Sequence, residues 1–134
     1  MGDLIVADTD AVIDFFSGRA PLSSAVRALI ESGRLAVTAV TVFELYAGIT
    51  GPKRLQELEK FLDRIPVLPL SAAEGEITGR LFTRLKSRGI TIGNQDLLIA
   101  ATVLALGLTL LTRNVDHFGA IEGLKIAPVA ARIG

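Results

Sequence analysis

The sequence predicts an α/β fold, a three-layer α/β/α sandwich around a central, mainly parallel sheet. Short uncharged apolar runs recur along the chain and indicate strands that are buried on both faces. Longer stretches with apolar residues at helical spacing separate them, and this alternation is typical of parallel sheets with crossover helices. The length of 134 residues suits one domain, so we expect residues 1–134 to form a single domain. The strand-like runs are residues 4–7, 35–38, 67–70, 108–111 and 124–127.

The first apolar run, Leu4–Ala7, is followed by two acids, Asp8 and Asp10. Because ligands of open parallel sheets gather at the carboxyl ends of the strands, Asp8 stands where a metal or phosphate site is expected. The structural alternative is that Asp8 or Asp10 caps the next helix. That helix is predicted to stop at Gly18, and we expect Asp14 on its exposed side.

The next segment predicts a helix over about 21–32, a second buried strand, and a further helix capped by Thr41 that runs through Gly48. Glu44 lies near the N-terminal end of this further helix. Thr41 and Glu44 also have the spacing of a capping box, which would give Glu44 a purely structural role. The function of Glu44 therefore stays open at this point.

Gly51-Pro52 marks a turn, and an amphipathic helix with charges on its outer faces is expected to follow and to end at Pro66. Ser71 and Glu74 form a second capping-box pattern before a long helix that ends near residues 87–89.

Asn94 is expected to cap a helix over residues 96–106 that is apolar on nearly every face and is therefore central to the fold. Asp96 then lies in the first turn of a buried helix, where it would interact favourably with the helix dipole. A buried carboxylate without a partner is costly, and a nearby cation would remove that cost. Polar residues also follow the fourth strand, namely Thr112, Arg113, Asn114 and Asp116.

The composition excludes several kinds of site. The chain has no Cys and one His, so disulfides, thiolate metal sites and His-rich zinc sites are excluded. Its formal net charge is zero, so any nucleic-acid site must be local. No apolar run reaches the roughly 18 to 20 residues of a membrane span, and acids interrupt the N-terminal apolar run, so we expect a soluble cytoplasmic protein without a signal peptide.

Four polar places fall at predicted strand ends or helix starts: Asp8, Glu44, Asp96 and the Asn114/Asp116 region. Oxygen ligands without Cys or His favour Mg²⁺, with Mn²⁺ as a possible substitute. Such an ion binds a phosphate oxygen and lowers the pKa of water, which suits attack on a phosphodiester.

Four segments together resemble the PIN-domain ribonucleases, and most closely their VapC-type toxins. The segments are IVADTDAVIDFF, TAVTVFELYAGI, GNQDLLIAATVLALG and LLTRNVDHFGAIEGLKI. The resemblance implies that Asp8, Glu44 and Asp96 are the core of a Mg²⁺ site.

The same resemblance implies roles for the residues nearby. Asp116 is the best candidate for a fourth, more variable acid, with Asn114 as a polar helper, and His117 stands where some relatives have an acid. Thr9 and Thr112 would hydrogen-bond the carboxylates or a metal-bound water. Arg113 would hold a substrate phosphate, or instead form a surface salt bridge, and His117 is expected to be a packing or surface residue.

The resemblance further implies metal-dependent endonucleolytic cleavage of RNA, leaving 5′-phosphate and 3′-hydroxyl ends. It implies a homodimer and neutralisation by a cognate VapB-type antitoxin, whose C-terminal segment would cover the acidic site, with a higher toxin–antitoxin assembly possible. The basic residues at 53–54 and 80–88 are secondary candidates for RNA contacts, because a neutral protein needs local positive charge to hold a polyanion.

Three alternatives remain from the residues alone. A haloacid dehalogenase-type phosphatase would use Asp8 as nucleophile and Asp10 as acid/base, with Thr38 imitating its second motif, although 134 residues leave little room for its cap. A non-catalytic PIN-like binding module is the second, and the three principal acids argue against it. A DNA or flap nuclease would use the same metal chemistry.

Overall fold

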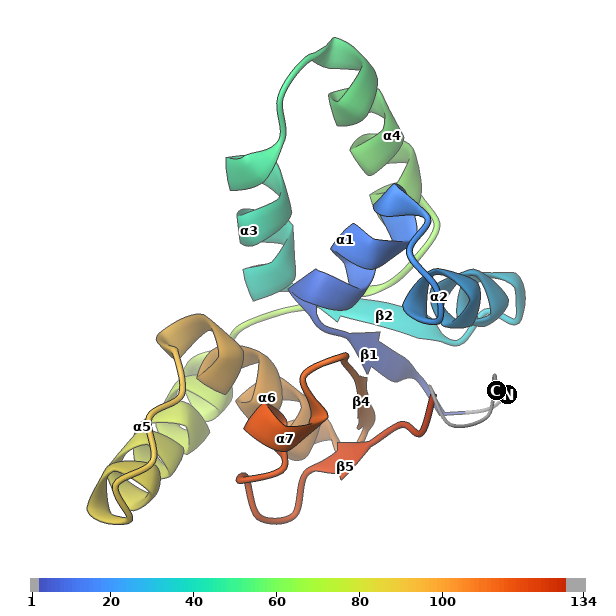
Figure 1. Ribbon diagram of the computed structural model, residues 1–134. Coiled ribbons are helices and arrows are strands. Elements are labelled where there is room, and N and C mark those ends of the chain that lie inside the picture. Colours follow the sequence, from blue (N-terminus) through green and yellow to red (C-terminus); the bar gives the residue numbers. More distant parts are fainter. Residues whose placement is uncertain (1–2, 130–134) are drawn as a thin grey trace.

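The computed structural model describes residues 3–129, which fold around a five-stranded parallel sheet (Figure 1). The strands are β1 (Ile5–Ala7), β2 (Leu35–Thr38), β3 (Val67–Leu68), β4 (Thr109–Leu111) and β5 (Lys125–Ile126). The helices are α1 (Thr9–Ser17), α2 (Leu22–Glu31), α3 (Ala39–Gly48), α4 (Pro52–Asp63), α5 (Ala72–Ser87), α6 (Asn94–Leu106) and α7 (Val115–Phe118). The predicted α/β fold is confirmed.

The strand order is β3-β2-β1-β4-β5, so the first strand of the chain lies at the centre of the sheet. Val6 pairs with Ala36 of β2 on one side and with Leu110 of β4 on the other. The chain thus builds the sheet outwards from β1 in one direction and later returns to build it in the other. This reversal makes the carboxyl end of β1 a topological switch point, where α/β proteins bind their ligands.

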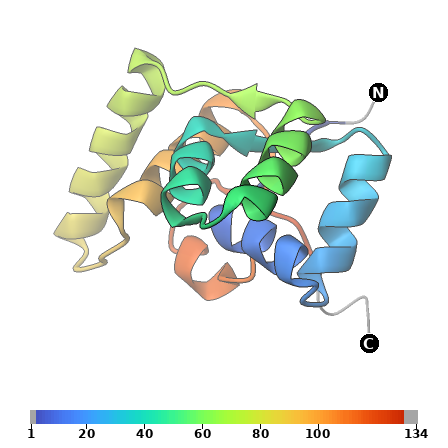
Figure 2. The same cartoon turned by 90° about the horizontal axis from the view of Figure 1, so that it is seen from above.

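Alternate residues of the central strands enter two different cores. Val6, Ala36 and Leu110 pack with α5 and α6, whereas Ala7, Val37 and Leu111 belong to the core under α1, α2 and α4. All six side chains are almost completely buried. This period of two, with both faces covered, explains why the central strands are mostly apolar. It also produces the three layers visible when Figures 1 and 2 are compared.

Helix α6 is the most buried helix, as predicted from its apolar faces, and Ile99, Ala100 and Val103 are fully inaccessible. Its expected cap was wrong: Gly93 is the N-cap and Asn94 is already the first helical residue. By contrast, the capping box of α5 is confirmed, since Glu74 accepts hydrogen bonds from the backbone N–H and the hydroxyl of Ser71. Figures 1 and 2 show α5 at the opposite side of the molecule from α2.

Candidate functional site

The candidate site lies at the switch point, where β1 and β4 end side by side. The backbone N–H of Asp8 donates to the carbonyl of Leu111 at 3.0 Å, which continues the pairing of the two strands by one residue. Asp8 and Thr112 therefore follow their strands at neighbouring positions. The juxtaposition of two chain segments more than 100 residues apart comes from strand pairing alone.

Asp8 is only 2% exposed, and two neutral donors hold its carboxylate. Its Oδ1 accepts from the backbone N–H of Ala11 at 2.8 Å, which makes Asp8 the N-cap of α1. Its Oδ2 accepts from the Thr112 hydroxyl at 2.5 Å. The predicted contact between Thr112 and a site carboxylate is confirmed, as is the cap role of Asp8. The alternative that Asp10 caps this helix is wrong.

Burial raises the pKa of Asp8 from its ordinary 3.8 to about 6. The hydrogen bonds from Thr112 and Ala11 lower this pKa, whereas the carboxylates of Asp10 and Asp96 raise it further. The charges of Asp10 and Asp96 thus lie within electrostatic reach of Asp8, although they come from α1 and α6. No basic side chain of the described residues pairs with Asp8, so the ionised carboxylate is left without a compensating charge.

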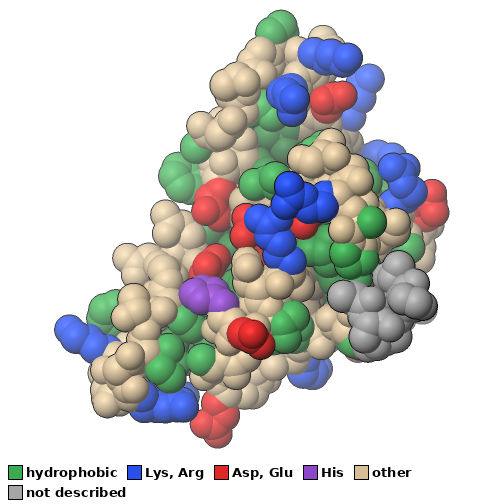
Figure 3. Space-filling model, viewed as in Figure 1, with side chains coloured by type: hydrophobic (Ala, Val, Ile, Leu, Met, Phe, Trp, Pro, Cys, Tyr) green, Lys and Arg blue, Asp and Glu red, His purple; other side chains and the backbone are tan. Residues whose placement is uncertain are grey.

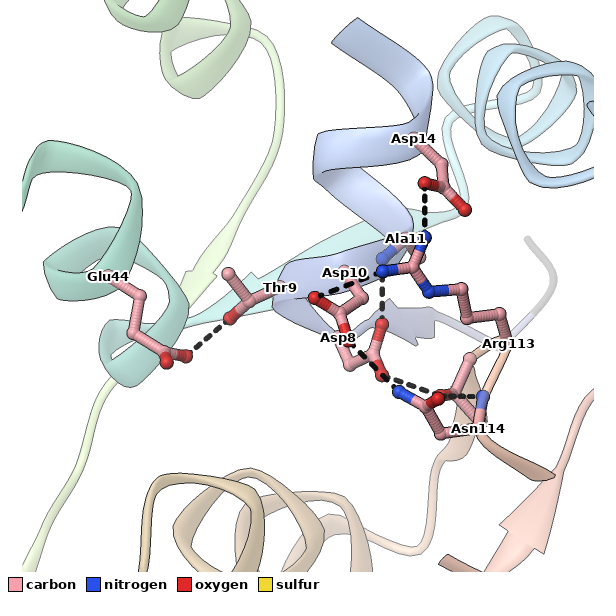
Figure 4. A network of polar contacts seen from close by, with 9 residues as sticks. Asp8, Thr9, Asp10, Ala11, Asp14, Glu44, Arg113 and Asn114 are labelled. Atoms are coloured by element: carbon pink, nitrogen blue, oxygen red, sulfur yellow. Dashed lines mark hydrogen bonds and ion pairs between the residues drawn. The ribbon is translucent and has the colours of Figure 1, made fainter. Parts of the chain in front are cut away.

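The residues after β4 contact two further acidic side chains of α1 (Figure 4). Asn114 donates from Nδ2 to Asp10 at 3.0 Å. Arg113 donates to Asp14 at 2.7 Å and lies 3.7 Å from Asp10. The salt-bridge alternative for Arg113 is confirmed. The prediction that Asp14 is exposed was wrong, because Asp14 is only 4% exposed and turns towards Arg113.

Glu44 reaches the site from α3. Thr9 donates from Oγ1 to Glu44 Oε1 at 2.6 Å, and the same hydroxyl lies 3.0 Å from that of Thr41. The expected cap at Thr41 and the capping box with Glu44 were wrong, because Thr38 caps α3 and accepts from the backbone N–H of Thr41. Glu44 is thereby free of a capping role, and Thr9 directs it towards the start of α1 (Figure 4).

Asp96 lies in the first turn of α6, but its side chain is 39% exposed. The expectation of a buried, unpaired carboxylate was wrong. Its Oδ2 lies 3.1 Å from Nε2 of His117, whose ring also packs edge-on against Phe118. Asp116 is exposed on α7 and has no side-chain hydrogen bond or ion pair among residues 3–129, so its role as a fourth acid stays a prediction.

Sequence reasoning missed the role of Asp14, and it gave Asp10 a role only as a possible helix cap or as the acid/base of the phosphatase alternative. One signal was present: Asp10 and Asp14 stand four residues apart, which places both on one face of α1, where a cation could serve both. The pairing of His117 with Asp96 joins residues 21 positions apart, and no local pattern points to it.

The donor chemistry of the site fits a hard divalent cation. Asp8, Asp96 and Glu44 offer carboxylate oxygens, and burial raises the pKa of Asp8 above its ordinary value. In residues 3–129, however, no three His, Asp or Glu side chains are gathered closely enough to enclose a metal ion. The acids share one edge of the sheet without forming a closed coordination shell.

Fold and site together define a parallel α/β protein with an acidic centre at the carboxyl ends of its strands. The chain belongs to the PIN-domain family, whose family model matches residues 5–124. This membership displaces the phosphatase alternative. Consistently, Thr38 serves as a helix cap.

Curated relatives carry ribonuclease names. The chain is 33% identical over 100 residues to ribonuclease VapC2 of Rickettsia felis, covering 72% of this chain and 75% of the relative. It is 32% identical over 109 residues to the tRNA(fMet)-specific endonuclease VapC of Shigella flexneri, covering 78% and 83%. Among solved structures, VapBC-1 from nontypeable Haemophilus influenzae superposes with a TM-score of 0.78 at 28% identity, covering 92% of this chain and 96% of that chain.

The chain is therefore a member of the PIN family that is similar to VapC ribonucleases of toxin–antitoxin systems. As for membranes, no helix within residues 3–129 combines the length and the apolar character needed to cross one.

Proposed function

We propose that this protein is a Mg²⁺-dependent endoribonuclease toxin and that residues 1–134 form a single PIN domain. The observation that carries the proposal is the buried carboxylate of Asp8. It lies at the switch point of a PIN fold, has only neutral donors, and feels the charges of two other acids. Ribonuclease names among the relatives support the same reaction class.

In this proposal Asp8, Glu44 and Asp96 hold the cation, and Asp116 is the candidate fourth acid. The cation would polarise a phosphate oxygen and lower the pKa of the attacking water, with Mn²⁺ as a possible substitute. Hydrolysis leaves 5′-phosphate and 3′-hydroxyl ends.

The remaining side chains position these acids. Thr112 fixes the orientation of Asp8, and Thr9 fixes that of Glu44. Asn114 and Arg113 hold Asp10 beside them. Because their neighbours hold Asp8 and Glu44 before any substrate arrives, little reorganisation is needed when the reaction begins.

Digestion of total RNA with mapped cut sites tests the proposal. The wild type should cleave RNA in Mg²⁺ or Mn²⁺ and not in EDTA, and Asp96→Asn should lose cleavage. Asp63→Asn, which removes an exposed acid at the end of α4, is the matched control and should retain full activity. Cleavage in EDTA, or equal activity of Asp96→Asn and wild type, would contradict the proposal. Asp116→Asn in the same assay decides whether a fourth acid takes part.

A non-catalytic binding module remains the alternative function, and the same assay separates the two. The module would bind RNA without cutting it in any metal. Substrates of DNA tested in parallel distinguish a ribonuclease from a DNA or flap nuclease with the same metal chemistry.

We further propose a VapB-type antitoxin as partner, because the neighbouring solved structure from Haemophilus influenzae is a VapBC complex. An apolar groove beside Glu44, lined by Ile13, Phe16, Leu45 and Ile49, supports this proposal. Ile13 and Phe16 are 44% and 37% exposed, which suits an apolar segment that would cover the acidic edge.

The toxin is proposed to be a homodimer that joins a higher toxin–antitoxin assembly. Phe43 and Tyr46 of α3 are 62% and 43% exposed, and Phe82 of α5 is 47% exposed. Large exposed aromatic side chains of this kind favour protein interfaces. Light scattering measures the oligomeric state of the isolated chain and of its complex with the antitoxin.

A further inference from the structure

A second groove is lined by Thr112 and Arg113, and Figure 4 shows Arg113 on the opposite side of Asp8 from Glu44. The groove has a volume of about 540 Å³ and lies between the α1–α2 turn, the segment after β4 and the segment after β5. Thr112 and Arg113 line it, and both also contact the acids of α1. The groove is therefore continuous with the acidic edge.

Two arginines, Arg19 and Arg113, are among the residues that line this groove. Asp14 holds both residues in place. Its side chain accepts from Arg113 at 2.7 Å, and its backbone carbonyl accepts from the backbone N–H of Arg19 at 2.8 Å. Gly18, with a positive φ of 70°, turns the chain after α1 and brings Arg19 back to this carbonyl.

The two arginines differ in whether an acidic side chain pairs with their charge. Arg113 is partly neutralised by Asp14 and Asp10, yet its side chain remains 40% exposed. Arg19 is exposed and makes no ion pair within the described part of the chain. The lining of the groove thus carries two cations against one buried acid. Figure 3 shows the blue cationic side chains directly beside the red acidic ones near the centre of this face.

The rest of the lining is largely aliphatic, with Pro21, Leu22, Ile126 and Val129. A strip with guanidinium groups and aliphatic side chains is complementary to a single polynucleotide strand, whose phosphates pair with arginine and whose sugars and bases pack on apolar surface. The acidic edge itself repels a polyanion, so a substrate strand needs a cationic contact close to it.

We propose that this groove holds the single-stranded RNA backbone on one side of the cleaved bond, with Arg19 and Arg113 contacting phosphates. The inference rests on the proposed ribonuclease function and adds the path of the substrate. It places the RNA strand in the groove lined by Arg19, and not along the basic residues at 80–88 of α5 and its C-terminal end.

The test measures binding separately from cleavage, with a fluorescent single-stranded oligoribonucleotide in EDTA. Arg19→Gln should weaken binding about threefold to tenfold at low salt. It should also reduce the magnitude of the slope of log K against log salt by about 0.7, as expected for one lost phosphate contact. Arg88→Gln, which removes an exposed charge at the end of α5, is the matched control and should change neither quantity.

Arg19 is chosen because Arg113→Gln would leave the buried Asp14 without its cation and so destabilise the fold. A wild type that binds no RNA, an Arg19→Gln variant that binds like wild type, or an equal loss in Arg88→Gln overturns the proposal.

A position-specific readout is available because the chain has no Cys. Val115 lines the groove and is 50% exposed, so Val115→Cys carries an environment-sensitive dye without burial of the label. The dye should respond to RNA, whereas a dye on Ser87→Cys of α5 should not. A dye at Val115 that responds to the antitoxin and not to RNA would assign the groove to the protein partner instead.

These outcomes separate the two proposals. If wild type cuts RNA in Mg²⁺ but Arg19→Gln binds normally, the groove assignment fails and the ribonuclease stands. If RNA binding depends on Arg19 but no metal supports cleavage, the groove stands and the catalytic proposal fails.

Discussion

Helix α1 has two nearly inaccessible aspartates, its N-cap Asp8 and its residue Asp14, which are 2% and 4% exposed. Asp14 has a cation of its own, because Arg113 donates to it at 2.7 Å. Asp8 has only the hydroxyl of Thr112 and a backbone N–H. One helix therefore carries a compensated and an uncompensated buried acid.

The difference in their partners indicates a structural role for Asp14 and a chemical role for Asp8. A buried carboxylate that is paired within the chain is complete and costs stability only when its partner is removed. A buried carboxylate with neutral donors and acidic neighbours is unfavourable when ionised, and an external cation relieves it. Asp14 accordingly belongs to the scaffold, and Asp8 is the acid that is suited to bind a metal.

The largest effect that we expect from the contrast between Asp8 and Asp14 is a loss of RNA cleavage. Asp8→Asn keeps the shape of the side chain and one acceptor oxygen, replaces the other oxygen with a donating NH2 group, and removes the charge. We expect its RNA cleavage rate to fall at least about a thousandfold, which corresponds to ~4 kcal/mol of lost transition-state stabilisation. Gel-based cleavage at saturating Mg²⁺ measures it, and Asp63→Asn serves as control. Cleavage within tenfold of wild type would end the assignment of Asp8 as a metal ligand.

The second effect concerns stability against pH in the absence of divalent cations. Burial raises the pKa of Asp8 to about 6, so between about pH 4 and 6 the folded state binds a proton that the unfolded state has lost. The contribution of Asp8 to wild-type stability therefore falls as pH rises through this window. Asp8→Asn lacks this loss, and above pH 6 it should gain up to ~3 kcal/mol relative to wild type compared with its value below pH 4.

Urea denaturation of both proteins in EDTA at pH 3.8, 5 and 7 gives that difference. Titrating groups that are not coupled to Asp8 are shared by both proteins and cancel in the comparison. A difference in stability that stays constant with pH would show that Asp8 titrates normally.

The third effect should have the opposite sign. Asp14→Asn removes the acid but leaves Arg113, and we expect a loss of about 2 kcal/mol at pH 7, since the guanidinium is partly exposed and solvent screens part of the cost. The same urea titration measures it. If Asp14→Asn is as stabilising at neutral pH as Asp8→Asn, the contrast between the two acids is wrong.

The smallest effect is the response to the cation itself. Mn²⁺ at ten times its dissociation constant should stabilise wild type by ~1.4 kcal/mol. Asp14→Asn should show the same gain, because it lies outside the proposed ligand set, and Asp8→Asn should show little or none. Thermal melts with Mn²⁺ and with EDTA give the comparison. Equal gains in all three proteins would place the cation elsewhere.

Much of the fold could be predicted from the sequence, because apolar periodicity and capping residues are local signals. The strand at 35–38, the helix stop at Gly18 and the capping box of Ser71 and Glu74 all follow such signals and are confirmed. The errors at Thr41 and Asn94 concern helix starts, where several polar residues compete for the cap.

The site was harder to predict from the sequence, since the contacts of its residues join distant parts of the chain. Asp14 was expected on the exposed face because the sequence around it does not show Arg113, which is 99 positions away. Glu44 matched a capping box by spacing, yet Thr9, 35 positions before it, holds its carboxylate. The position of Asp8 after a strand predicts that it reaches the edge of the sheet, whereas the partners of the acids follow only from the packed structure.

The hydrogen bonds that hold the carboxylate of Asp8 have a consequence for how the activity of the site is regulated. Its two oxygens are each anchored to a different segment, one to the beginning of α1 and one to the residue after β4. The group cannot rotate without breaking both attachments, so the centre has no simple off position of its own. In the ribonuclease toxin that we propose, control of activity would therefore fall to a second molecule that blocks access to the site from outside.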